Sequence, residues 1–195
     1  MDIYISENAF MILTLSAVET SVTRECAGLL FGYKTPEKYF LELATPFQLA
    51  NRKYDTIYIN PMRKHKLYRM IDNYLKYQFI GEYHSHPEGV PRPSEDDIKY
   101  IFREEYPIEI IMSIREDKEF KPWKIKKNVL SGSLYRYFIE MASFQLVGKG
   151  RHKRIQVLNI ECPYALGFEA VHNPPVQANP EKKGSFKKSK YRKSI

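Results

Sequence analysis

The stretch FIGEYHSHPEGVPRPSEDDIKYIFREEYPIEIIMSIRE, residues 79–116, reads as a strand, a tight turn, a helix and a second strand. Its ends, residues 79–87 and 108–116, are short apolar runs that favour strands. Ser94 between them is typical of a helix N-cap, and three acids follow it in the first turn. Apolar residues then recur at the spacing of one helical face, at Ile98, Ile101 and Phe102. This order predicts a mixed α/β fold.

Hydrophobic periodicity predicts two further helices. The first covers residues 6–18, with Ser6 as its cap. The second begins at Pro61, whose fixed backbone angle suits the first helical turn, and runs to residue 78. Its apolar face is formed by Leu67, Met70, Ile71, Tyr74 and Leu75. The remaining apolar or alternating runs are most simply strands, at residues 26–34, 39–50, 54–60, 120–129, 133–147 and 154–161. Pro46 predicts a bend or an edge position for residues 39–50.

The composition changes near residue 168. The 195 residues are enough for one domain with a full core, and 43% of them are apolar. Residues 181–195 contribute +6 of the net charge of +8, and prolines precede them. We therefore expect one domain over residues 1–168 and a disordered basic tail over residues 169–195. The tail is either a solvated end or a segment that binds nucleic acid or an acidic partner.

The cellular setting follows from the start of the chain and from its cysteines. The apolar run at residues 9–18 is too short to span a bilayer and follows acids, so neither a signal peptide nor a membrane helix is expected. Cys26 and Cys162 are too few for a disulfide framework. We expect a cytoplasmic protein.

Two histidines lie at the end of the strand expected over residues 79–87. His84 and His86 point to the same face of that strand, because successive side chains alternate. Among the three acids at residues 95–97, Asp97 lies nearest to the core face of the helix and is the best placed third ligand. Two histidines, one carboxylate and an open fourth position are typical of a catalytic zinc site. The alternative is an ordinary hydrogen-bonded pair of histidines.

Glu25 stands at the mouth of a buried strand, an uncomfortable place for a charge that has neither a partner nor a role. The alternative is an ion pair with the neighbouring Arg24. The segment ECAGLLFG at residues 25–32, the sequence His-Ser-His-Pro at residues 84–87, and Ser94 and Asp97 together resemble the complete JAMM motif of the MPN-plus metallopeptidases. Seven residues separate the second histidine from the serine, and two separate the serine from the aspartate.

The resemblance implies a fold and a set of roles. The fold would be a cytidine-deaminase-like mixed sheet sandwiched by helices. One zinc ion per chain would be held by His84, His86 and Asp97. Glu25 would take a proton from the attacking water and pass it to the leaving amine. Ser94 would donate a hydrogen bond to the developing oxyanion, although its position also suits a cap alone.

The reaction implied is hydrolysis of a peptide or isopeptide bond after the C-terminal glycine of a ubiquitin-like protein or a sulfur-carrier protein. Precursor processing and deconjugation both fit, and the resemblance leaves a homodimer open. Two alternatives belong to other classes. One is a zinc hydrolase of a different amide substrate, since a fold does not fix a function. The other is a non-enzymatic binding module that uses the basic tail.

Overall fold

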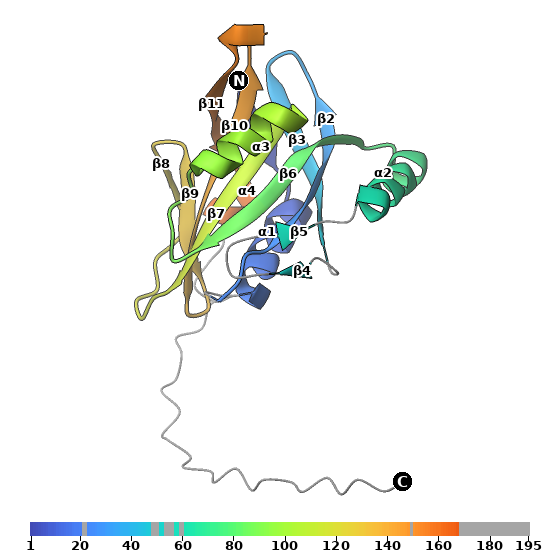
Figure 1. Ribbon diagram of the computed structural model, residues 1–195. Helices are drawn as coiled ribbons and strands as arrows, with labels where there is room; N and C mark the ends of the chain where they lie inside the picture. The colour runs from blue at the N-terminus through green and yellow to red at the C-terminus, as the bar shows by residue number, and fades with distance from the viewer. Residues whose placement is uncertain (21–22, 48–50, 53–56, 59–60, 149, 168–195) are drawn as a thin grey trace, which may run out of the picture.

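The computed structural model describes residues 1–20, 23–47, 51–52, 57–58, 61–148 and 150–167 (Figure 1). The helices are α1 (Glu7–Thr20), α2 (Pro61–Leu75), α3 (Glu95–Glu104) and α4 (Pro163–Leu166), with a 3-10 turn, η1 (Gly150–His152). The strands are β1 (Asp2–Ile5), β2 (Ala27–Lys34), β3 (Lys38–Pro46), β4 (Asn51–Arg52), β5 (Ile57–Tyr58), β6 (Gln78–Pro87), β7 (Ile108–Glu116), β8 (Lys124–Lys126), β9 (Val129–Leu134), β10 (Tyr137–Val147) and β11 (Arg154–Glu161). The predicted tail and parts of the strands predicted over residues 39–50 and 54–60 lie outside the described residues.

The large sheet closes on itself. Its strand order is β11-β1-β3-β2-β6-β7-β10-β9-β8, and β10 also pairs with β11. One edge of β10 is shared: Tyr137–Ala142 pairs with β9, and Ser143–Val147 pairs with β11. Because β11 also pairs in parallel with β1, the strands from β11 to β10 form a ring. The mixed α/β class is confirmed, whereas this closed sheet does not confirm the cytidine-deaminase-like layered arrangement.

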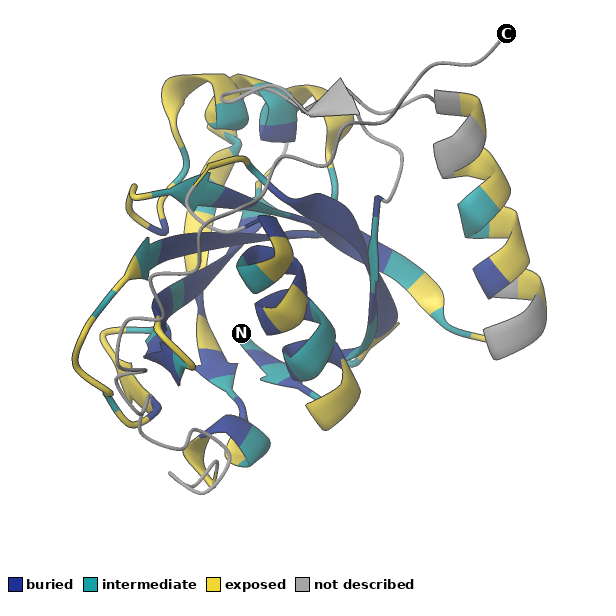
Figure 2. Ribbon diagram, turned by 90° about the horizontal axis from the view of Figure 1, so that it is seen from below, coloured by how far each residue is buried: buried dark blue, intermediate teal, exposed yellow. Residues whose placement is uncertain are grey.

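Helix α1 packs against the inner face of the sheet. Phe10, Leu13 and Ala17 of α1 are buried and belong to the main hydrophobic core. Strands all around the ring contribute to the same core, through Ile3, Leu41, Tyr83, Ile110, Met141 and Leu158. Figure 2 shows mostly buried strands around this helix. The expected cap is present, since the backbone N–H of Ala9 donates to Ser6 Oγ at 3.3 Å.

Helices α2 and α3 lie on the outer face. Ile71 of α2 packs with Leu29 and Phe31 of β2 in a second apolar cluster. Helix α3 connects the parallel strands β6 and β7, as the sequence of residues 79–116 predicts. Of its three predicted core residues, Ile101 is buried, whereas Ile98 is exposed. Met70 of α2, also predicted on a core face, is exposed as well.

The strand boundaries after residue 120 differ from the prediction. The expected strands over residues 120–129 and 133–147 are replaced by β8, β9 and β10, which are joined by tight turns. Lys127 and Asn128 form the first turn and both have positive φ, as a two-residue hairpin requires. Tyr135 opens the second turn, again with positive φ. Neither turn contains a glycine or a proline, so neither was predicted.

Strand β3 also departs from its prediction. The strand ends at Pro46, and of the two alternatives predicted from this proline the edge position is wrong, because β3 pairs with both β1 and β2. Strand β1 and helix α4 were not predicted at all. Both are short, so their apolar residues show no period that distinguishes them from loops.

Gly28 on β2 is required by a close approach. A Cβ atom at this position would lie 2.3 Å from the carbonyl oxygen of Thr45 and 2.5 Å from the ring of Tyr83. The Tyr83 ring can therefore cross β2 only where a side chain is missing. Its hydroxyl reaches α1 and donates to Ser16 Oγ at 3.2 Å. This contact fixes β6, which carries the two histidines, against the core.

Candidate metal centre

Strand β6 places both histidines on the outer face of the sheet. Tyr83 and Ser85 are fully buried on the inner side of the sheet. Because side chains alternate along a strand, His84 and His86 point to the outer side. Ser85 holds this end of β6 to the segment before β2: its Oγ accepts from the N–H of Cys26 and its own N–H donates to the Cys26 carbonyl, both at 2.9 Å. The strand end is therefore fixed, and so are the two imidazoles.

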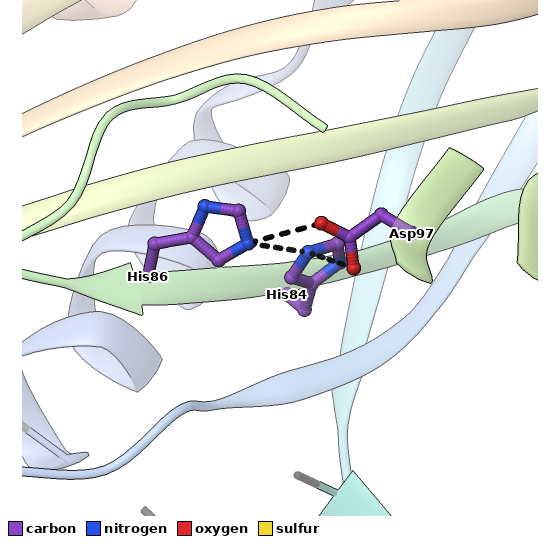
Figure 3. A group of neighbouring side chains, drawn as sticks. All are labelled: His84, His86 and Asp97. Atoms are coloured by element: carbon purple, nitrogen blue, oxygen red, sulfur yellow. Dashed lines mark hydrogen bonds and ion pairs between the residues drawn. The ribbon is translucent and has the colours of Figure 1, made fainter. Parts of the chain in front are cut away.

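Helix α3 brings Asp97 to these rings (Figure 3). The His84 Nε2 atom lies 3.3 Å from Asp97 Oδ1, and His86 Nε2 lies 3.3 Å from Asp97 Oδ2. The two Nε2 atoms are 3.1 Å apart. One ligand atom from each residue lies within 4.8 Å of the others, and this set can hold a metal ion. The choice of Asp97 over its two neighbours agrees with this geometry.

Each imidazole is oriented through its other nitrogen. His84 Nδ1 lies 2.9 Å from Glu109 Oε1, and His86 Nδ1 lies 3.1 Å from the Val90 carbonyl oxygen. A carboxylate and a carbonyl can only accept, so both Nδ1 atoms must carry the proton. Both Nε2 atoms are then directed toward Asp97 and, without a proton of their own, offer lone pairs to a metal ion.

Burial lowers the pKa of His84, but hydrogen bonds with Asp97 and Glu109 outweigh it and raise that pKa to about 10. Burial also raises the pKa of Asp97, and hydrogen bonds with His84 and His86 outweigh this and hold that pKa well below its usual range. Without a metal ion, His84 and Asp97 therefore form an ion pair at neutral pH. A metal ion that binds here must replace a proton.

Ser94 caps α3 and contacts Asp97 directly. Its Oγ accepts from the Asp97 N–H at 3.2 Å and donates to Asp97 Oδ2 at 2.6 Å. The Ser94 N–H donates to the same oxygen at 2.7 Å. This capping box confirms the expected N-cap. The Ser94 hydroxyl has a single proton to donate, and in this structure it donates it to Asp97.

Glu25 lies one residue before the part of the chain that pairs with β6. Ala27 is paired with His84, and the Cys26–Ser85 hydrogen bonds continue this antiparallel register. Glu25 directly precedes Cys26, so its backbone lies next to the end of β6 that carries His84 and His86. The structure thus places it at the same end of the sheet as the three candidate ligands.

Two buried acids on the outer face were not assigned to a site by sequence reasoning. Glu109 of β7 contacts His84, and Glu82 of β6 accepts from the Tyr100 hydroxyl of α3 at 3.2 Å. Within their apolar runs, neither glutamate is distinguished by spacing from an ordinary strand residue. The signal was present, because Glu109 interrupts the apolar run of residues 108–112, and a buried charge needs a partner.

The donor set suits a borderline metal ion such as zinc. Two imidazole nitrogens and one carboxylate oxygen are ligands that zinc prefers, and three protein ligands leave a position for water or substrate. Part of the site is accessible, since the side chains of His84, His86 and Asp97 are 15%, 17% and 21% exposed. The described part of the chain contains no helix that could cross a membrane.

Comparisons with known proteins concern the family and the fold. Residues 14–126 match a family model described as prokaryotic homologs of the JAB domain, and this range includes Glu25 and the three candidate ligands. None of the curated proteins matches the chain. Among solved structures, the solution structure of protein DSY2949 from Desulfitobacterium hafniense is similar over 82% of this chain and 92% of that chain, with 17% identity and a TM-score of 0.56. That likeness supports the fold. The chain belongs to the family of prokaryotic homologues of the JAB domain.

Proposed function

We propose that the protein is a zinc-dependent hydrolase of peptide or isopeptide bonds. The observation that carries the proposal is the convergence of His84, His86 and Asp97 within 4.8 Å, in a member of the JAB-domain family. One zinc ion per chain fits the two imidazoles and the carboxylate. Zinc held by these residues would supply a Lewis acid that activates water at neutral pH.

Glu25 is the proposed general base. Glu25 directly precedes Cys26, which is hydrogen-bonded to Ser85 between the two histidines, and this nearness along the chain supports the assignment. A base there can take a proton from the attacking water and give it to the leaving amine. The nearby Asp97 is not available for this role, because it is one of the three candidate metal ligands.

Ser94 is the proposed oxyanion donor. A positioned donor of this kind contributes roughly 3 kcal/mol to the transition state. In the structure the Ser94 hydroxyl donates its hydrogen bond to Asp97 Oδ2, so it would have to rotate from Asp97 toward the oxyanion during the reaction. The backbone N–H of Ser94 remains on Asp97 and can keep this carboxylate in place. In this proposal the Ser94 hydroxyl stabilises the oxyanion, and the Ser94 backbone N–H holds Asp97.

The proposed substrate is a ubiquitin-like or sulfur-carrier protein, cut after its C-terminal glycine. Support comes from the JAMM-like motif and from the family match. A reducing, cytoplasmic setting is part of the proposal. It agrees with Cys26 and Cys162, which are both buried free thiols. The competing candidate is hydrolysis of another amide at the same metal site.

Cleavage of a Gly-Gly-linked fusion of a ubiquitin-like protein tests the proposal. Zinc-loaded wild type should release the C-terminal partner, and Glu25→Gln should abolish release while it retains zinc. Glu37→Gln, at an exposed glutamate in the turn after β2 and therefore beyond the opposite end of that strand from His84, is the matched control and should behave like wild type. Equal activity of Glu25→Gln would remove Glu25 as the base. Turnover of a small amide without cleavage of any Gly-terminated protein would favour the competing candidate.

A further inference from the structure

We propose that Glu109 is a positioning residue for the metal centre: it fixes the His84 imidazole in the orientation and tautomer that bind the metal, and it adds a negative charge beside that ligand. The inference rests on the proposed metal site. It goes further in assigning a part of the centre to strand β7, which contributes no residue to the JAMM-like motif.

The register of β6 and β7 puts Glu109 where it can reach His84. Glu109 is paired with Glu82, and His84 is paired with Ile111, so Glu109 lies diagonally beside His84 on the same face. The carboxylate Oε1 atom lies 2.9 Å from His84 Nδ1. The Glu109 side chain is only 5% exposed, and solvent therefore weakens this contact little.

Packing alone gives no reason for a glutamate here. Residues 108, 110, 111 and 112 of β7 are fully buried apolar side chains, and an apolar residue at position 109 would continue the run. A buried carboxylate is costly unless it is paired. The Oε2 atom of Glu109 is buried and has no hydrogen-bond partner within the described residues, so His84 is the group that compensates this acid.

The chemistry of metal-bound histidine explains such a pair. A carboxylate that accepts from Nδ1 fixes the ring and makes Nε2 a stronger donor to the metal. His84 and His86 are unequal in this respect. His86 donates to the carbonyl of Val90, which is an exposed turn residue, whereas His84 donates to a buried charge. His84 is therefore the more firmly held of the two histidine ligands.

Zinc affinity of Glu109→Gln tests the inference. The amide oxygen of glutamine still accepts from Nδ1, so this variant removes the charge and leaves the contact in place. We expect its zinc dissociation constant to rise about tenfold, measured by competition with a chromogenic chelator. Glu140→Gln is the matched control: Glu140 is a partly buried acid on β10 whose partners are Ser113 and Arg115 rather than a histidine, and its zinc affinity should be unchanged.

A spectroscopic measurement separates positioning from a merely structural role. In the zinc-loaded wild type, the Nδ1 proton of His84 should give a downfield, slowly exchanging proton resonance, which should move upfield in Glu109→Gln. If that variant does not fold, the wild-type spectrum still decides, because an unprotonated Nδ1 would overturn the inference. If the wild type binds zinc and Glu109→Gln binds it with the same affinity, this inference is wrong and the proposed metal site still stands. A wild type that binds no zinc would overturn the proposed function as well.

Discussion

Replacement of Ser94 by alanine should loosen the start of α3. The hydroxyl accepts the Asp97 N–H at 3.2 Å, and alanine leaves that donor without its cap. Helix α3 contacts the rest of the domain through the buried side chain of Ile101 and through the Tyr100 hydroxyl, which donates to Glu82. With a single buried side chain, the helix depends on its N-terminal cap for its stability. Loss of a serine cap costs about 1 kcal/mol, which corresponds to a drop of about 2–4 °C in Tm for a domain of this size.

The assay is thermal and urea unfolding of the metal-free protein, followed by circular dichroism. Ser94→Thr keeps the hydroxyl and should unfold close to wild type. Ser94→Gly removes the hydroxyl but suits the cap backbone, and it should fall between Thr and Ala. If Ser94→Ala were as stable as wild type, the cap assignment would be wrong.

The same variant separates two roles of the hydroxyl in the active enzyme. If Ser94 donates to the oxyanion, zinc-saturated Ser94→Ala should lose roughly 100-fold in kcat. If the hydroxyl only holds Asp97, zinc affinity should fall and the kcat of zinc-saturated protein should stay near that of wild type. The proposed function predicts the first result, and an unchanged kcat at saturating zinc would refute the oxyanion role.

Other predictions concern the core and the charge of the site. Gly28→Ala should lower the urea midpoint by the equivalent of about 1–3 kcal/mol, since its Cβ would meet Thr45 and Tyr83; an unchanged midpoint would contradict this close approach. Apparent zinc affinity should rise by about tenfold per pH unit from about pH 6 to 8, because zinc displaces the proton of His84; an affinity independent of pH would exclude that proton. The metal-free fold should lose the stability that His84 contributes as pH rises from 6.5 to about 10, since its pKa is raised on folding. A pH series of urea midpoints measures this loss.

Local sequence patterns predicted the centre of the fold well. The strand–helix–strand unit over residues 79–116 was predictable because its periodicity, its Ser94 cap and its acids all act within a few residues. The pair His84 and His86 followed from strand alternation, and Asp97 followed from helical geometry. Each of these inferences needs only neighbours in the sequence.

Pairing between distant strands was beyond local patterns. The ring closes because β11 pairs with both β1 and β10, and nothing within residues 154–161 marks that double pairing. The contact of Glu109 with His84 has the same origin, since it depends on the register of two parallel strands joined by α3. Sequence reasoning can mark Glu109 as a buried charge, but only the register shows which group it contacts.

The zinc content of the purified protein tests the central claim most directly. Wild type should bind about one zinc per chain, and His86→Ala and Asp97→Ala should bind none at the same free zinc concentration. Asp96→Ala is the matched control, because Asp96 lies on the same helical turn but is 91% exposed and paired with Lys99. It should retain the metal. Folded wild type without zinc, or zinc that persists in Asp97→Ala, would contradict the three-ligand centre.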